Sequence, residues 1–226
     1  MIIPEELEEK QKLLRALFNT RKPMAASTQF LTIQDLYLQV RKGERGFVQL
    51  SSLQPIPQDD RIYLWKGDIT RLEVDAIVNA ANKTLLGRMK PLHDCVDNAI
   101  HTYAGVQLRQ ACFELILEQG YEEPVGMAKS LQLTTSFCFC HSYSRSENSR
   151  QPTQIDEDLL AKSYLSVLAL AEKNNIESIA IPCLSTGDFN FPKQKAAKIA
   201  IQTVKTFINE SSIIKKSYLT YLMMKI

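Results

Sequence analysis

The stretch Lys66–Asn82, KGDITRLEVDAIVNAAN, decides the fold. The apolar residues 62–65 before it and 76–78 within it each have the composition of a buried β-strand. The turn residues Gly67 and Asp68 lie between them. The segment therefore predicts two buried strands that are neighbours in one sheet.

Two asparagines, Asn79 and Asn82, follow the second strand among small residues. In an open α/β sheet, ligands bind at the carboxyl ends of the strands. A strand that ends in Asn-Ala-Ala-Asn offers an accessible backbone and amide hydrogen bonds. We therefore expect a polyhydroxylated ligand rather than a metal at this edge.

Outward from this stretch, helical patterns alternate with short apolar strands. Residues 159–173 and 192–209 have the apolar spacing of helices, and residues 177–182 form a short apolar strand. This alternation predicts a layered α/β fold. Further helices are expected over residues 4–19 (starting at Pro4), 32–38 and 99–117.

Length and composition bound the class of protein. A chain of 226 residues, 45% hydrophobic and 23% charged, allows one sizeable globular domain with an extension. Glycines and prolines between residues 43 and 57 mark a linker. We therefore expect a helical extension over residues 1–57 and a single domain over residues 58–226.

Charge and cysteine content limit the partners. A net charge of +2 is too small to indicate nucleic-acid binding. We find neither an apolar run of membrane-spanning length nor a signal-peptide pattern. Five cysteines, an odd number, suit a reducing compartment. We therefore expect a cytoplasmic protein that binds no nucleic acid or membrane and is a monomer.

Two stretches, in order and at the expected separation, carry a family resemblance. Lys66–Asn82 resembles the opening of the macrodomain family, whose members are ADP-ribose-binding α/β modules, and Pro182–Phe189 (PCLSTGDF) resembles the second ligand loop of that family. The resemblance implies a three-layer α/β/α domain with a mixed central sheet behind an N-terminal helical extension. It implies ligand contacts at Asp68, Ile69, Asn82, Asn98, Ser185, Thr186, Gly187, Asp188 and Phe189.

The segment Leu86–Arg109 resembles the zinc-containing bacterial and fungal branch of the family. That branch has a Cys-x4-His-x-Cys run followed by an Asp-Asn pair. Here His93 and Cys95 match the metal ligands, while Arg88 stands where the first cysteine is expected. Resemblance to this branch implies zinc as the cofactor, which would lower the pKa of a bound water and orient it.

The same resemblance implies a protein-ADP-ribosyl hydrolase, which removes ADP-ribose from modified proteins. Asn82 and Asp97 would be the catalytic residues. The Asp68 carboxylate would accept a hydrogen bond from the adenine amino group. One alternative is a module that binds ADP-ribose without turnover, which the missing metal ligand favours. Another is a decayed, inactive homologue.

Each of these side chains also has a purely structural interpretation. Asp68 is a common turn residue, and Asn82 could cap a helix that starts at Lys83. Asp97 could cap the following helix, and Phe189 could be an ordinary buried aromatic. His101 is expected to pack on its helix rather than act as a base.

Residues 130–150 and 217–226 depart from the family pattern. A shifted reading frame restores family-like sequence in two places. Codons for Ser130–Ser136 (SLQLTTS) can encode ITAAYNL out of frame, and codons for Phe139–Ser146 (FCHSYSRS) can encode FVIHTVGP. Both products resemble family strands. Ser217–Ile226 can likewise give VIFNVFNDED. Small insertions or deletions in the coding sequence explain all of these, and the alternative is ordinary divergence.

This interpretation has a structural consequence. The strand over residues 130–146 should lie in the middle of the sheet, where parallel strands are apolar. The early C-terminal end should remove a strand and leave an unpaired edge. We therefore expect a chain that is markedly less stable than its frame-restored counterpart and that has little or no hydrolase activity. The polar residues concerned are Gln132, Thr134, Thr135, Ser136, His141, Ser142, Ser144 and Arg145.

Overall fold

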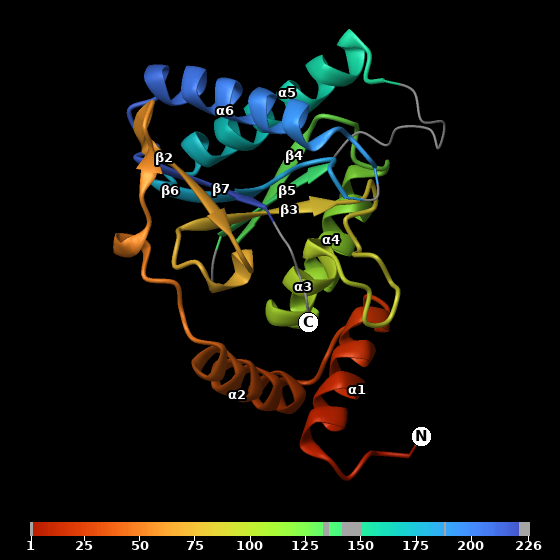
Figure 1. The fold of residues 1–226 in the computed structure, drawn as a ribbon. Helices are drawn as coiled ribbons and strands as arrows, with labels where there is room; N and C mark the ends of the chain where they lie inside the picture. Colours follow the sequence, from red (N-terminus) through yellow and green to blue (C-terminus); the bar gives the residue numbers. More distant parts are fainter. Residues whose placement is uncertain (1, 133–135, 142–150, 188, 222–226) are drawn as a thin grey trace.

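The computed structural model describes residues 2–132, 136–141, 151–187 and 189–221 (Figure 1). Within this part of the chain a seven-stranded sheet runs in the order β1-β2-β7-β6-β3-β5-β4. The five inner strands are parallel, and β1 and β4 pair antiparallel at the two ends. The sheet is therefore mixed, as expected. The strands are β1 Pro55–Ile56, β2 Asp59–Lys66, β3 Ala76–Ala81, β4 Ala128–Gln132, β5 Ser136–His141, β6 Ser178–Pro182 and β7 Lys216–Tyr221.

Helices cover both faces of this sheet, which gives the expected three layers (Figure 1). α5 and α6 lie on one face, and α3 and α4 lie on the other. α1 and α2 form the N-terminal extension outside α3 and α4. None of the helices in the described ranges is both long and apolar enough to span a bilayer. The helices are α1 Leu7–Thr20, α2 Thr28–Arg45, α3 Val96–Tyr103, α4 Val106–Gln119, α5 Gln154–Lys173 and α6 Lys193–Glu210.

Two hydrophobic clusters fill the spaces between the layers. Alternate residues of one strand point to opposite faces, so Ile179 and Ile181 of β6 join the cluster under α5 and α6, while Ala180 joins the cluster on the α3 and α4 side. Burial of these side chains on both faces holds the inner strands in register. The parallel strands therefore form a rigid base for the loops that leave their carboxyl ends.

The extension is docked on the domain by buried polar contacts as well as by packing. Gln34 of α2 accepts a hydrogen bond from the backbone N–H of Val106 at 2.9 Å and donates to Oε1 of Gln107 at 2.7 Å. The Gln34 side chain thus provides an acceptor for one of the N–H groups at the start of α4 that have no partner within the helix. A Cβ on Gly105 would lie 2.5 Å from Nε2 of Gln34, so the fit requires glycine there. The boundary between residues 57 and 58 stays a prediction.

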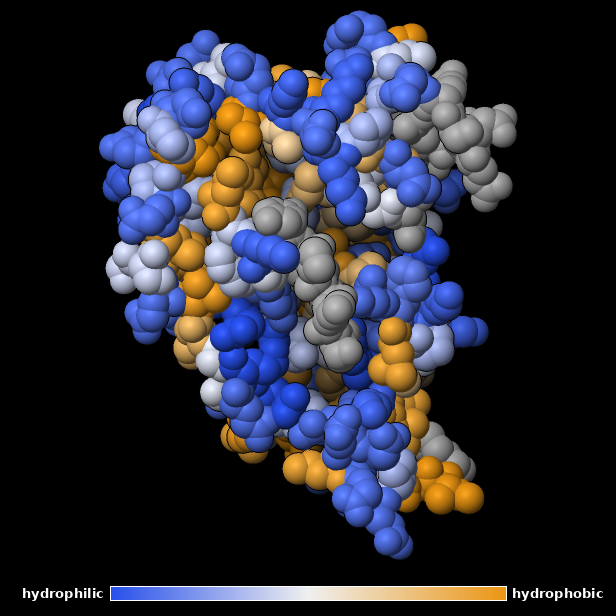
Figure 2. Space-filling model, in the orientation of Figure 1, coloured by the Kyte–Doolittle hydropathy of each residue, from blue (hydrophilic) through white to orange (hydrophobic). Residues whose placement is uncertain are grey.

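The extension also carries much of the exposed hydrophobic surface, visible at the bottom of the view (Figure 2). Ile33, Leu36 and Val40 of α2 are each about 60% exposed, at 61%, 59% and 59%. They follow one another at helical spacing on one stripe. The inner side of α2 thus contacts the domain through polar residues such as Gln34, while an apolar stripe faces outward.

The predicted pairing of the first two strands is wrong. β7 and β6 lie between β2 and β3. β2 and β3 run in the same direction, and a parallel pair needs a crossover of about a dozen residues or more. Residues 67–75 are too few for such a crossover, so β2 pairs with β7 instead.

Two helix predictions also need correction. The expected helix 99–117 is two helices, because Gly105 adopts φ +81° and breaks the hydrogen-bond ladder between α3 and α4. The first helix starts at Leu7, not at Pro4. The polar side chain of Glu6 occupies the position before it.

The consequences predicted for the altered segments are wrong in two respects. β4 is the edge strand, whereas β5 lies inside the sheet between β3 and β4, so only the first part of this segment departs from the predicted interior position. The edge position lets Gln132 reach solvent. At the other segment β7 is present and lies between β2 and β6, so no strand is missing there. The remaining polar positions, Thr134, Thr135, Ser142, Ser144 and Arg145, lie outside the described residues.

Candidate ligand-binding site

Three of the predicted loops leave the same edge of the sheet. Asp68 follows β2, the loop from Ser185 follows β6, and Asn82 follows β3, and these three strands point in one direction. The strand order places Asp68 at one end, the Ser185 loop nearer the middle and Asn82 at the other end. Three strand spacings of about 4.8 Å separate β2 from β3, or about 14 Å. An elongated ligand with different groups along its length fits this spacing.

Asp68 is held firmly at its end of the edge. Its Oδ1 accepts from the backbone N–H of Thr70 at 2.9 Å and from the Thr70 hydroxyl at 2.7 Å. Its Oδ2 accepts from Arg45, the last residue of α2. Ile69 follows with only 1% of its surface exposed, in the hydrophobic core, so its predicted role as a ligand contact stays a prediction.

The Ser185 loop turns through a conformation that the sequence did not reveal. Ser185 adopts φ +63°, a left-handed conformation that non-glycine residues rarely adopt. Its side chain is buried, and its hydroxyl has no hydrogen-bond partner among the described residues. The carbonyl of Ser185 accepts from the N–H of Phe191 at 3.0 Å, which closes the loop. Strained backbone and an unpaired polar atom at a loop tip are typical of ligand sites.

The glycine of this loop does not need its conformational freedom. Gly187 has no left-handed φ, and a Cβ built on it would meet nothing within 4 Å. Open space therefore lies beside the backbone of Gly187. Thr186 is partly buried and donates its hydroxyl to the Cys183 carbonyl at 2.9 Å. Phe189 is also partly buried, and Asp188 lies outside the described residues.

Asn82 shapes the third loop rather than capping a helix. Its Oδ1 accepts from the N–H of Thr84 at 3.0 Å and from the Thr84 hydroxyl at 2.7 Å, and its Nδ2 donates to the Gly87 carbonyl at 2.9 Å. No helix starts at Lys83. An amide has two N–H donors, so one N–H of Asn82 remains for a ligand.

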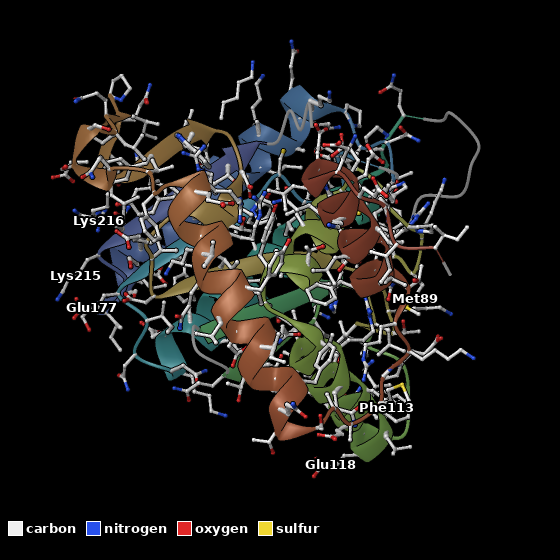
Figure 3. All side chains as sticks on the ribbon, turned by 90° about the horizontal axis from the view of Figure 1, so that it is seen from below. Met89, Phe113, Glu118, Glu177, Lys215 and Lys216 are labelled. Carbon is white, nitrogen blue, oxygen red and sulfur yellow. The ribbon has the colours of Figure 1, made fainter. Side chains whose placement is uncertain are left out.

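The loop after Asn82 is tightly wound. Leu85, Gly87, Met89 and Leu92 all have φ between +53° and +79°. Seen from below, α1 and α2 lie in front of α3 and α4, and Met89 lies on the loop near α1 (Figure 3). Left-handed residues concentrate where structure serves a function.

Asp97, on the first turn of α3, has a buried partner that the sequence analysis did not assign. Nδ2 of Asn79 donates to Oδ1 of Asp97 at 2.8 Å. Burial raises the pKa of Asp97 to about 6, although the Asn79 hydrogen bond and the Arg109 charge oppose that rise. Asn79 lies inside β3, not after it, and is fully buried. An asparagine within an otherwise apolar strand was the available signal for this pair.

His101 packs in the interior, as predicted. It is 2% exposed, and its Nε2 lies 3.5 Å from Oδ1 of Asp97. Burial and the positive charge of Arg109 lower the pKa of His101 to about 3. The imidazole is therefore neutral at physiological pH.

The two predicted metal ligands lie just before α3. Cys95 is the N-cap of the helix, and its Sγ accepts from the Asn98 N–H at 3.4 Å. Nδ1 of His93 is buried and has no hydrogen-bond partner among the described residues. The described part of the chain has no group of three His, Cys, Asp or Glu side chains placed to hold a metal. Stable zinc sites usually have at least three protein ligands, so these residues alone do not fit one.

The N-terminal extension reaches this loop through Asn19. Its Oδ1 accepts from the N–H of Leu92 at 3.1 Å, and its Nδ2 donates to the Thr102 hydroxyl at 3.0 Å. Asn98 is also buried and donates from Nδ2 to the Lys90 carbonyl at 2.8 Å. The Asn98 amide therefore supports the loop from within, and its predicted role as a ligand contact stays a prediction.

Comparisons with known proteins agree with this architecture. Residues 78–200 match the Macro domain family. The chain is 47% identical over 209 residues to a protein of Treponema medium named protein-ADP-ribose hydrolase, covering 90% of this chain and 79% of that one. It is 40% identical to a Staphylococcus aureus (strain COL) protein of the same name, covering 94% of this chain and 80% of that one.

Solved structures show the same fold. The Trypanosoma brucei macrodomain in complex with ADP-ribose has a TM-score of 0.65 and 25% identity, covering 92% of this chain and 89% of that chain. The Oceanobacillus iheyensis macrodomain with ADP has a TM-score of 0.61 and 32% identity, covering 73% and 84%. With the family match and these identities together, the chain belongs to the macrodomain family.

Proposed function

We propose that this chain binds ADP-ribose along the carboxyl edge of its sheet and hydrolyses the bond between ADP-ribose and a modified protein. The order of the three loops carries this proposal. It places a carboxylate, a loop with open backbone and an amide in a line, as a base, a diphosphate and a distal ribose would require. The relatives named protein-ADP-ribose hydrolase support the reaction type.

The chemistry of each position supports its assignment. Asp68 keeps an acceptor for the amino group of adenine. The backbone N–H groups around Gly187 can form a nest for the negatively charged phosphates, because the space beside that residue is open. The distal ribose then lies over Asn82 and the start of α3, where the remaining amide N–H meets a hydroxyl and backbone N–H groups point outward.

Asp97 is the residue that we propose for handling the attacking water. Oδ1 is held by Asn79, which leaves Oδ2 to accept a hydrogen bond and orient the water. The water oxygen bonds to the anomeric carbon of the ribose. The bond from that carbon to the protein side chain breaks, and the water's proton passes to the leaving group. Positioning of this kind contributes by fixing geometry before the reaction.

Release of ADP-ribose from a modified protein tests the proposal. Asp97→Asn should abolish release while ADP-ribose still binds. Glu118→Gln is the matched control, because Glu118 is an exposed acid on α4 (Figure 3). Binding without release by the unmodified chain would instead support the second candidate, a non-catalytic ADP-ribose-binding module. That candidate is favoured by one observation, the arginine at position 88 in place of a metal ligand.

We further propose that His93 and Cys95 are the remaining part of a zinc site, as the zinc-containing branch implies. The unpartnered Nδ1 of His93 suits a ligand position. Two protein donors would hold the metal only weakly, and the positive charge of Arg88, which stands where a third ligand is expected, opposes metal binding. For that reason no step above is routed through zinc.

We also propose that small insertions or deletions altered residues 130–146 and 217–226. The support is the out-of-frame reading, in which the protein fixes two of the three bases of each codon. Resequencing the gene tests it.

We also propose a cytoplasmic location, because the number of cysteines is odd and the thiols of Cys112 and Cys183 are free.

A further inference from the structure

One residue of the extension reaches the base-binding end of the site. Arg45 is the last residue of α2, and its Nη2 donates to both Oδ2 of Asp68 and Oγ1 of Thr70. Its guanidinium carbon lies 3.4 Å from the ring centroid of Tyr103, the last residue of α3. The side chain of Arg45 is 15% exposed. The extension therefore contributes a partly buried cation directly behind the carboxylate.

The hydrogen bonds around Asp68 leave room for one more donor. A carboxylate has about four acceptor positions, two on each oxygen. Oδ1 receives two donors from Thr70, and Oδ2 receives one from Arg45. One acceptor position on Oδ2 remains, and the side chain of Asp68 is still 24% exposed.

We propose that Arg45 is a positioning residue that makes the site selective for a purine with a 6-amino group. It fixes the Asp68 carboxylate so that a single acceptor faces the ligand. Without Arg45, the carboxylate loses one of its three fixed donors and the oxygen that would meet the base becomes free to turn and to bind water. This inference rests on the proposed binding of ADP-ribose, and it assigns to α2 a part in ligand choice.

The planar shape of arginine suits the position of Arg45 between Asp68 and Tyr103. The guanidinium carbon lies over the ring of Tyr103, and Nη2 at the same time donates to Asp68 and Thr70. A lysine ammonium has the charge and several donors on one nitrogen, but it has no flat face to stack on Tyr103. Arg45→Lys should therefore recover the function only in part.

The experiment compares two ligands by calorimetry. One is ADP-ribose, and the other is its analogue with hydrogen in place of the 6-amino group. Arg45→Met should weaken ADP-ribose binding about tenfold, the size of one hydrogen bond to a charged group, and leave analogue binding nearly unchanged. Arg45→Lys should fall between Arg45→Met and the unmodified chain.

Arg41→Met is the matched control, because Arg41 lies one turn earlier on α2 and pairs with Glu44 of the same helix. Melting temperatures show whether each variant is folded. Equal loss of affinity for both ligands, or an Arg45→Met affinity equal to that of the control, would overturn the inference and leave the proposed function intact. Absence of ADP-ribose binding by the unmodified chain would instead remove the proposed function, and this inference with it.

Discussion

Nη1 of Arg109, on α4, donates to the carbonyl oxygen of Phe18 at 2.7 Å. The same nitrogen donates to the carbonyl of Arg21 at 2.7 Å, and Nε donates to the carbonyl of Leu86 at 2.7 Å. The last carbonyls of a helix have no partner within the helix. Arg109 therefore closes the end of α1 and ties it to the loop that follows β3.

Arg109→Met should destabilise the chain by about 2–4 kcal/mol, because it leaves buried carbonyl groups without donors. Lys12→Met is a suitable comparison, since Lys12 is an exposed cation on α1 and should change the free energy of unfolding by less than about 0.5 kcal/mol. Urea unfolding measures both. Equal stability of the two variants would contradict the role given to Arg109.

Gly187→Val should remove ADP-ribose binding without loss of stability. The new side chain would occupy the open space where we place the phosphates, and the backbone conformation there accepts any residue. Gly43→Val, at another open position, on α2, is the control. Calorimetry measures the affinity of each variant for ADP-ribose, and a melting curve measures its stability. Retained affinity in Gly187→Val would place the phosphates elsewhere.

Arg88→Cys should raise the zinc content of the purified protein, because it supplies a third soft ligand beside His93 and Cys95. Arg88→Ser is the control that removes the charge without adding a thiolate. Elemental analysis gives the metal content of each. If both variants hold as little zinc as the unmodified chain, the proposed remnant site is refuted.

His101 should make the fold sensitive to acid. In the folded chain burial lowers the pKa of His101 to about 3, whereas the unfolded histidine takes up a proton near pH 6.5. The unfolded state therefore binds more protons between these values, and stability falls as the pH drops from about 6.5 toward 3. The raised pKa of Asp97 acts in the opposite direction between about 6 and 4.

The variant His101→Gln removes the destabilisation that comes from the histidine and leaves the contribution of Asp97 in place. Between pH 7 and 5 the unmodified chain should lose about 2 kcal/mol relative to this variant. Unfolding curves at pH 7 and pH 5 provide the comparison, and pH 7 is the internal reference because both chains are then uncharged at this position. Parallel pH dependence of the two chains would show that His101 does not stay neutral.

Much of this fold was predictable from local pattern. Alternating helical and strand signals predicted the layered fold. β6 and α6 lie within about one residue of their expected bounds, whereas α5 starts at Gln154 rather than at residue 159. Strand order was not predictable in the same way. Whether β2 pairs with β3 or with β7 depends on the length of the connection and on a segment far along the chain, which no local pattern records.

The site was predictable as a set of loops but not as a set of contacts. Asp68 and Asn82 lie at the expected edge, yet their partners Arg45 and Gly87 follow only from the folded arrangement. The left-handed turn at Ser185 has no sequence signal, since serine usually avoids that conformation. Tertiary structure supplies these features by holding side chains in positions that their own sequence neighbourhood does not specify.

The position of β7 has a consequence for the order of folding. Ile62 of β2 pairs with Ser217 of β7, so the strand that joins the two parts of the sheet is made after the other described strands. Until β7 has left the ribosome, β2 with β1 and the group β6-β3-β5-β4 are separate pieces. Contacts of such long sequence separation form slowly. The Asp68 end and the Asn82 end of the site are therefore joined through the sheet only once β7 has paired with both β2 and β6.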